Sequence, residues 1–303
     1  MNKIYYINRR TEQIEKEEVY GGALLTFIYG SSLLNKTLGK CLQVLFSCSA
    51  VFSRFYGYLQ KLPLSKKKII PFIKKFHVNE SEFQDPLSSF SCFNDFFIRK
   101  LKKNARPIDS RSNSIIIPAD GRYLIYPDIQ EANGFVIKEK KFDLKKLIND
   151  DLLTEKYSDG SMVIARLCPS DYHRFHFPLD AFAKETHLIN GYLYSVNPIA
   201  LRANLNIFVE NKRAYTLLET KHSGTILFME VGATNVGSIH QTYVSNTYVK
   251  KGEEKGYFSF GGSTLVLLFE KNKIQFDKDL LKASETHIEV LCKMGESMGI
   301  EFE

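Results

Sequence analysis

Short apolar runs separated by turn residues fill the chain from residue 115 onward and constrain its fold more than any other feature. They read IIIP, YLIYP, GFVI, MVIARL, TILFMEVGA, YVSNTYV and STLVLLFE. Gly, Pro, Asn and Asp punctuate them, a pattern typical of β-strands joined by turns. Helical patterns do not alternate regularly with these runs, and the clearest cover residues 142–153 and a stretch near 198–208. We therefore predict an α+β protein with a mostly antiparallel β domain, and not a doubly wound parallel sheet.

Composition is that of a folded protein. The 303 residues are 44% hydrophobic and 25% charged, enough to bury a sizeable core. The five cysteines form no CxxC pair and are odd in number, which argues against a disulfide framework or a zinc site and favours a reducing compartment.

Positive charge is concentrated at the N-terminus. Residues 1–75 hold 13 Lys and Arg against 4 Glu, whereas residues 76–303 hold 28 against 30 acidic residues. Such an asymmetry indicates contact with an anionic partner. No nucleic-acid-binding motif accompanies these bases and the rest of the chain is slightly acidic, so we predict no nucleic-acid partner.

Two apolar stretches lie within this basic region, at residues 20–34 (YGGALLTFIYGSSLL) and 41–51 (CLQVLFSCSAV). Both are shorter than the roughly 18 to 20 residues that span a bilayer. Lys, Arg, Phe and Tyr surround them, which is typical of amphipathic helices lying in an anionic membrane interface. A helical pair packed on the main domain is the alternative. We predict a membrane-associating helical segment over residues 1–76 and a catalytic domain over 77–303, in which FNDFFIRKL (93–101) has a helical pattern.

Two short motifs contain acid–base candidates. PADG (118–121) places Asp120 in a turn after an apolar strand, either as an orienting carboxylate or as a turn residue bonded to its own backbone. PSDYHRFHFP (169–178) contains His173 and His176, which point to opposite faces if the stretch is extended and share a face if it turns. Either is a candidate base or an ordinary core histidine. A third ligand at a metal-like spacing is lacking, so we predict no metal.

The third motif, GGST (261–264), lies between an aromatic stretch and an apolar strand. Paired glycines can adopt positive φ and expose the carbonyl of Gly262 to the hydroxyl of Ser263. A flexible turn is the alternative. Asp120, His176 and Ser263 would together supply an orienting group, a base and a nucleophile. A serine hydrolase with an intact chain could use the same residues, although GxSxG is absent. A non-catalytic membrane-binding protein is a further alternative.

Seven motifs occur in order along the chain: FNDFFIRKLKKNARPID (93–109), PADG (118–121), PSDYHRFHFP (169–178), LYSVNP (193–198), EVGATNVGSI (230–239), KGEEKGYF (251–258) and GGST (261–264). With these motifs the chain resembles the phosphatidylserine decarboxylase family, which consists of membrane-associated, self-cleaving enzymes with a pyruvoyl group. The resemblance rests on motifs in the same order over about two-thirds of the chain. GGST replaces the LGST of many members, and the N-terminal segment is similar only in character.

This resemblance implies a carboxy-lyase that converts phosphatidylserine to phosphatidylethanolamine and CO2. Asp120 would be the orienting acid, His176 the general base, and Ser263 the residue that attacks the Gly262 carbonyl. Autocatalytic serinolysis would split the chain between Gly262 and Ser263 into a large piece (1–262) and a small one (263–303), converting residue 263 to the pyruvoyl cofactor. The cofactor would form a Schiff base with the substrate amine. His173 would lie near the substrate and take part in decarboxylation or return the proton afterwards.

The resemblance also implies the partners and the location. Phosphatidylserine in an anionic membrane would be the substrate, and the cleaved small chain would stay bound. The protein would be peripheral, on the cytoplasmic face of the cell membrane. A decarboxylase acting on a small soluble amino acid would not need the basic, apolar N-terminus. Whether the chain forms a homodimer is left open.

Overall fold

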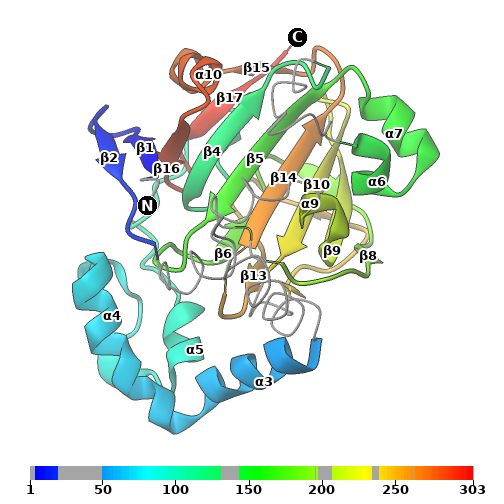
Figure 1. Cartoon of the computed structure of the whole chain (residues 1–303). Coiled ribbons are helices and arrows are strands. Elements are labelled where there is room, and N and C mark those ends of the chain that lie inside the picture. Colours follow the sequence, from blue (N-terminus) through cyan, green and yellow to red (C-terminus); the bar gives the residue numbers. More distant parts are fainter. Residues whose placement is uncertain are drawn as a thin grey trace, which may run out of the picture.

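A computed structural model describes residues 4–19, 50–130, 143–194, 196, 207–233, 239–261 and 263–302. A large sheet dominates the molecule, and a group of helices lies beyond one end of its strands (Figure 1). The apolar stretch at residues 20–34 and most of the one at 41–51 lie outside the described residues.

The main sheet follows the order β12-β7-β9-β10-β14-β5-β4-β16-β1-β2, with β8 also paired to β9. Its described strands pair antiparallel except β1 and β16, which run parallel. The predicted α+β fold with mostly antiparallel strands is therefore confirmed. The strands are β1 (Tyr5–Asn8), β2 (Ile14–Lys16), β4 (Gly121–Tyr126), β5 (Ser161–Leu167), β7 (Ala181–Ala183), β8 (His187–Ile189), β9 (Arg213–Glu219), β10 (Thr225–Gly232), β12 (Thr247–Val249), β14 (Ser263–Phe269) and β16 (Glu289–Cys292).

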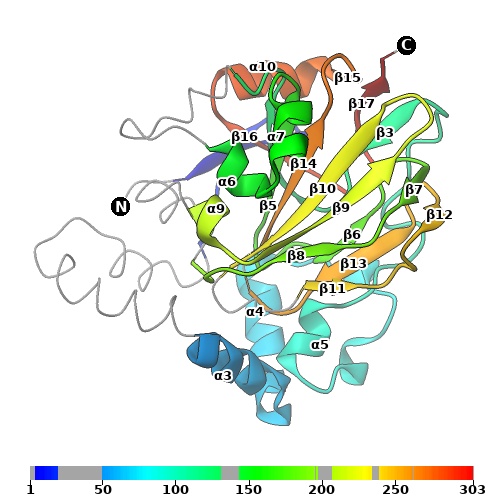
Figure 2. The ribbon, with the colours of Figure 1, turned by 90° about the vertical axis from the view of Figure 1, so that its right-hand side faces the viewer.

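Two smaller antiparallel sheets complete the β structure. One contains β11 (Ile239–Gln241), β13 (Glu254–Phe258) and β6 (Arg174–His176), and the other contains β15 (Ile274–Phe276), β17 (Ser297–Glu301) and β3 (Ser114–Ile116). Figure 2 shows β11, β13 and β6 on one side of β10 and β14. On the other side lie three short helices, α6 (Leu144–Ile148), α7 (Asp151–Tyr157) and α9 (Ile207–Glu210).

Strand β14 is buried on both sides, which explains its uninterrupted apolar sequence. Leu265 and Leu267 join the core shared with β6 and β13, and we call this side the inner face. Val266 and Leu268 join the core shared with α6, α7 and α9, and we call this side the helix face. Because successive side chains of a strand alternate, each residue of β14 can be assigned to one face.

A helical unit packs beside the strand ends (Figure 1). Its aromatic core includes Phe72, Phe93, Phe96 and also Phe260, which lies shortly before β14. Among the described residues, no helix is long and apolar enough to cross a membrane. The unit comprises α3 (Ala50–Lys61), η3 (Pro63–Lys68), α4 (Ile69–Phe76), η4 (Glu80–Glu82), η5 (Leu87–Ser89) and α5 (Phe93–Phe97).

Several elements differ from the sequence prediction. The helix predicted at residues 142–153 is two helices, because Asn149 ends α6 in the left-handed conformation (φ 58°) and Asp150 caps α7. The stretch near 198–208 lies largely outside the described residues. Helix α10 (Lys278–Glu285) was not predicted. Residues 5–16, within the segment expected to be helical, form β1 and β2 of the main sheet.

Candidate active site

Ser263 is the first residue of β14, and all seven residues of that strand are buried. It lies opposite Leu167 at the end of β5 and Gly232 at the end of β10. Alternation from Leu265 places its side chain on the inner face. The hydroxyl Oγ is buried and has no hydrogen-bond partner in the part of the chain that the structure describes. A buried polar atom left unpaired costs on the order of 1–3 kcal/mol, so it requires an explanation.

The chain just before Ser263 is anchored to the helical unit. The backbone N–H of Phe260 donates to Asn94 Oδ1 at 3.1 Å. The Phe260 ring packs edge-on against Phe93 and Phe97, with centroids 5.2 and 5.0 Å apart. Gly261 has φ 143°, a conformation that glycine adopts at little cost. Gly262 lies outside the described residues. These contacts favour a held turn over a loose linker.

A tight turn follows β5 and leads to the histidines. The N–H of Asp171 donates to the Cys168 carbonyl at 2.8 Å, and the Asp171 carboxylate accepts from the N–H of Cys168 at 2.7 Å. Arg122 forms an ion pair with the same carboxylate. Arg99 donates to the Ser170 carbonyl at 3.1 Å. The turn therefore rests on side chains from β4 and from the segment after α5, and it directs the chain into β6.

His173 is fully buried at the end of this turn. Its Nδ1 lies 3.0 Å from the Asp171 carbonyl, which can only accept, so Nδ1 carries the proton and Nε2 has the free lone pair. Nε2 is buried and has no hydrogen-bond partner among the described residues. The Phe97 ring packs on the imidazole with centroids 3.9 Å apart. Burial lowers the pKa of His173 to about 4, so the ring is neutral at pH 7.

His176 lies in β6 with its ring between two polar partners. Nδ1 donates to the Gly252 carbonyl at 2.9 Å, which leaves Nε2 to accept from the Tyr172 hydroxyl at 3.4 Å. Burial lowers the pKa of His176, so this histidine is also neutral at pH 7. Since Phe175 packs in the core of the inner face, strand alternation directs His176 to the opposite side of β6.

Asp120 is buried and its carboxylate is surrounded by donors. Arg106 binds it through Nε and Nη2 at 2.6 to 3.1 Å, Lys293 Nζ lies 3.2 Å away, and the N–H of Met294 donates at 2.9 Å. Burial opposes ionisation, but these cations and donors outweigh it, and the pKa of Asp120 is well below its usual range. The carboxylate of this turn aspartate is therefore bound by Arg106, Lys293 and Met294, which lie outside the PADG turn.

The structure links the three motifs through the backbone. The N–H of His176 donates to the Pro118 carbonyl at 2.8 Å, which joins the PADG turn to β6. The N–H of Phe258 donates to the His173 carbonyl at 3.0 Å, which joins the histidine turn to the chain leading into β14. Direct side-chain hydrogen bonds between Asp120, His176 and Ser263 are not present among the described residues. The hydrogen bond of His176 Nδ1 goes to Gly252, and Asp120 is linked to His176 only through Pro118.

Two residues of the Asp120 site were missed by the sequence analysis. Arg106 lies in the long motif at 93–109. Because a buried carboxylate needs a cationic partner, an arginine in a motif close to Asp120 in the sequence is a signal that could have identified it. Lys293 is 173 positions from Asp120, and no local pattern identifies it. Because Lys293 and Met294 belong to residues 263–303, this segment contributes to both Asp120 and the serine.

A buried charge cluster lies on the helix face next to Ser263. Arg166 in β5 binds Glu17 at 2.6 Å and Glu289 at 2.9 Å. Arg122 in β4 lies 3.5 Å from the same Glu17 carboxylate. Thr264 is the strand partner of Arg166. Glu17 thus fastens the N-terminal residues to the strand that lies beside β14.

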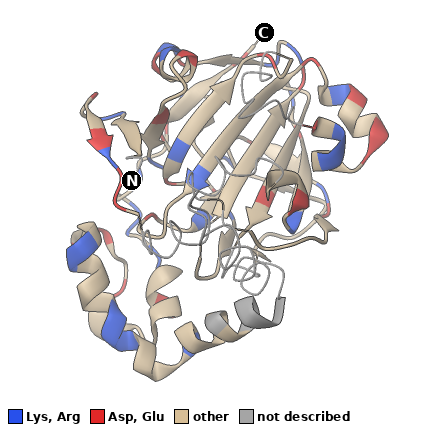
Figure 3. Ribbon diagram, viewed as in Figure 1, with Lys and Arg blue, Asp and Glu red and all other residues tan. Residues whose placement is uncertain are grey.

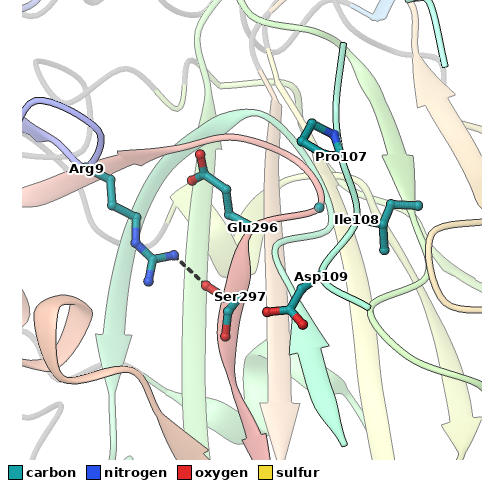
Figure 4. Close-up of a pocket in the computed structure, with 7 residues that line it drawn as sticks. Arg9, Pro107, Ile108, Asp109, Glu296 and Ser297 are labelled. Atoms are coloured by element: carbon teal, nitrogen blue, oxygen red, sulfur yellow. Dashed lines mark hydrogen bonds between the residues drawn. The ribbon is translucent and has the colours of Figure 1, made fainter. Parts of the chain in front are cut away.

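A shallow pocket of about 400 Å³ is lined by Pro107 and Gly295, which directly follow two Asp120 contacts, Arg106 and Met294, in the chain. Figure 4 shows this pocket. Arg9 donates to the Ser297 carbonyl at its edge and binds Asp277 at 2.8 Å and Asp279 at 2.7 Å. Its acidic groups are engaged by arginines, since Asp109 binds Arg111 and Glu296 binds Arg10. Elsewhere, no cluster of three His, Cys, Asp or Glu suited to a metal ion occurs among the described residues.

Comparison with known proteins agrees with the resemblance. The family model described as "Phosphatidylserine decarboxylase" matches residues 93–300. Three similar curated proteins are named phosphatidylserine decarboxylase proenzyme. They come from Chlamydia pneumoniae (47% identical), Chlamydia felis (48%) and Chlamydia caviae (50%), and each alignment covers 99% of this chain and 98% of the relative. The serine hydrolase alternative is not supported by these matches. The chain belongs to the phosphatidylserine decarboxylase family and is therefore a carboxy-lyase.

Proposed function

We propose that this protein decarboxylates phosphatidylserine to phosphatidylethanolamine and CO2, using a pyruvoyl group that it makes from Ser263. The observation that carries the proposal is the unpaired, buried hydroxyl of Ser263 at the start of β14. The preceding chain is anchored at Phe260, and Gly261 adopts positive φ. A serine held in this way suits attack on its own backbone better than attack on an external substrate.

Self-cleavage requires a base for the Ser263 hydroxyl. We assign this role to His176, with Asp120 supporting it through the PADG turn. Its Nε2 carries no proton and accepts only a long hydrogen bond from the Tyr172 hydroxyl, at 3.4 Å, so it can take up the serine proton. The serine oxygen would bond to the Gly262 carbonyl carbon as the peptide C–N bond breaks, so an ester replaces the amide. Elimination then releases residues 1–262, and hydrolysis with loss of ammonia leaves the pyruvoyl group at residue 263.

The surroundings of Ser263 fit a small, uncharged carbonyl group. The position is fully buried, and the unpaired Nε2 of His173 belongs to the turn that follows β5. The pyruvoyl group supplies the electron sink for loss of CO2. Neutral His173 can hold or return a proton through Nε2. Phe97 and Phe260 pack around this region, and their burial helps to exclude water.

The small piece is expected to remain bound after cleavage. Strand β14 lies between β10 and β5, and β16 lies between β4 and β1. Every residue of β14 is buried, so release would expose a large apolar area and break two strand pairings. The Asp120 contacts to Lys293 and Met294 also cross between the pieces.

We further propose peripheral membrane association through the helical unit, on the cytoplasmic face. Leu64, Ile70, Phe55 and Tyr58 are exposed on it by 57% to 73%. Basic residues occupy the same unit, at Lys66, Lys67 and Lys68 in η3 and at Lys74 and Lys75 in α4 (Figure 3). Exposed apolar groups beside lysines suit an anionic bilayer surface. Replacing Leu64 and Ile70 by Ser should weaken sedimentation with phosphatidylserine vesicles and leave self-cleavage unchanged.

Intact-mass spectrometry combined with a vesicle assay tests the main proposal. The purified protein should appear as two pieces that divide before residue 263, and the small piece should have the mass expected for pyruvoyl in place of serine. Vesicles containing phosphatidylserine should accumulate phosphatidylethanolamine. A single unmodified chain, or vesicle binding without conversion, would refute the proposal.

A further inference from the structure

A buried ion pair joins the sheet that carries Ser263 to the sheet that carries His176. Lys255 of β13 and Glu230 of β10 are both 0% exposed, and Lys255 Nζ lies 2.5 Å from Glu230 Oε1. Nζ also donates to Gln241 Oε1 at 2.9 Å. The rings of Phe228 and Tyr243 lie 5.0 and 5.2 Å from Nζ. The mechanism described above does not use this pair.

Glu230 lies on the same face of the main sheet as Ser263. In the register of β10 and β14, Glu230 is opposite Leu265 and Gly232 is opposite Ser263. Leu265 belongs to the inner face, so Glu230 and Ser263 do as well. The two side chains are diagonal neighbours on adjacent strands, within reach of a long side chain. Glu230 Oε2, like Ser263 Oγ, lacks a hydrogen-bond partner among the described residues.

A β-bulge directs Lys255 to this position. The pairing of β13 with β6 shifts between Glu254, opposite His176, and Gly256, opposite Phe175, which leaves Lys255 as the extra residue. Bulges re-aim a side chain relative to the regular strand. Gly256 permits the close approach, since a Cβ there would lie 2.1 Å from the His240 carbonyl oxygen.

A buried ion pair restricts how two sheets can slide past each other. Apolar side chains tolerate small displacements, but a displaced Lys255 would leave two buried charges without partners, which is costly. Burial already raises the pKa of Glu230 and lowers that of Lys255, so both depend on their mutual contact. β14 pairs with β10, and β6 pairs with β13. The pair therefore connects the strand of the serine to the strand of the histidine.

We propose that the Glu230–Lys255 pair is a positioning device that holds Ser263 in place against the histidine-bearing strand β6 during self-cleavage. This inference rests on the proposed self-cleavage, to which it adds Glu230 and Lys255 as positioning residues. The pair acts through strand placement and is not assigned a role in proton transfer.

The test compares the self-cleavage rate with thermal stability in three variants made by cell-free synthesis. The double variant Glu230→Leu with Lys255→Met replaces the ion pair by apolar groups, a change that is often neutral for stability. Glu230→Gln keeps the shape and removes the charge. Ile226→Ala, on the same strand and face as Glu230 and fully buried, loses packing alone and is the control.

We expect the double variant to melt near the wild-type temperature but to cleave about tenfold more slowly or worse, because small misplacements of reacting groups are costly. Glu230→Gln should slow cleavage more than Ile226→Ala does at a similar loss of stability. Cleavage of the double variant at the wild-type rate would overturn the inference. If the double variant does not fold, the comparison of Glu230→Gln with Ile226→Ala decides. A wild-type chain that stays intact would instead refute the proposed function.

Discussion

The carboxylate of Asp120 and the hydroxyl of Ser263 are equally buried, but their surroundings are opposite. Asp120 is bonded by Arg106, Lys293 and the backbone of Met294, whereas Ser263 Oγ has no partner among the described residues. A buried carboxylate without donors would be protonated, so its contacts are needed to keep it charged. A buried hydroxyl costs far less to leave unpaired. Asp120 is thus held by several contacts, whereas the hydroxyl of Ser263, the proposed reacting group, has none among the described residues.

The largest effect is expected from removing the free hydroxyl. Ser263→Ala should leave a full-length chain without decarboxylase activity, because no oxygen can attack the Gly262 carbonyl. Gel mobility and intact mass measure the cleavage. Thr264→Val is the matched control, since the Thr264 hydroxyl is also buried and unpaired among the described residues but points to the helix face. Thr264→Val should still cleave, and efficient cleavage of Ser263→Ala would contradict the assigned role.

Next in size is the loss of the Asp120 charge. Asp120→Asn leaves Arg106 and Lys293 facing a neutral amide, and breaking a buried ion pair in this way costs about 3 to 5 kcal/mol. Urea unfolding of the Ser263→Ala precursor, with and without Asp120→Asn, measures this loss of stability. Asp109→Asn, which removes a pair with the exposed Arg111, should cost less than about 1 kcal/mol. An equal loss of unfolding free energy in the two variants would show that the buried Asp120 contacts stabilise the fold no more than an exposed ion pair does.

The unpaired nitrogen of His173 predicts a pH effect of intermediate size. Its folded-state pKa of about 4 is below the unfolded value of 6.5, so between these pH values the unfolded chain binds a proton that the native chain does not. Stability is therefore lost as the pH falls through this window, by up to about 3 kcal/mol.

Replacing His173 should weaken the pH dependence of stability. In urea unfolding between pH 7 and 4.5, His173→Gln should lose less stability than the wild type as the pH falls. His187→Gln, at an exposed position, is the control. If the unfolding free energies of His173→Gln and the wild type fall in parallel with pH, His173 accepts a proton in the native state as readily as in the unfolded chain.

The smallest effect is expected from removing one of the hydrogen-bond donors to Asp120. Lys293 is 27% exposed and lies 3.2 Å from the carboxylate, and Arg106 remains when it is removed. Lys293→Met should cost only about 1 kcal/mol and leave cleavage largely intact. Thermal melting measures the change, with the exposed Lys250→Met as control. A loss as large as that of Asp120→Asn would show that the donors are not redundant.

Local patterns predicted much of this molecule. The apolar runs at β4, β5, β10 and β14 are recognisable as strands because they are short, contain Ile, Val, Tyr or Phe, and are bounded by turn residues. GGST, PADG and the histidine motif can be found because turn residues mark them at the ends of strands. The pairing of β1 with β16 was not predicted, since Tyr5–Asn8 is short and its partner lies at the other end of the chain.

The sequence by itself therefore determined the strand-rich class, the family and the candidate reactive residues, because these depend on local composition and on motifs. Only the tertiary structure decided which groups support them. Lys293 reaches Asp120 across 173 positions, and Glu230 meets Lys255 because two sheets pack face to face. These contacts depend on register and burial, which are set when the whole core assembles and leave no periodic trace in the sequence.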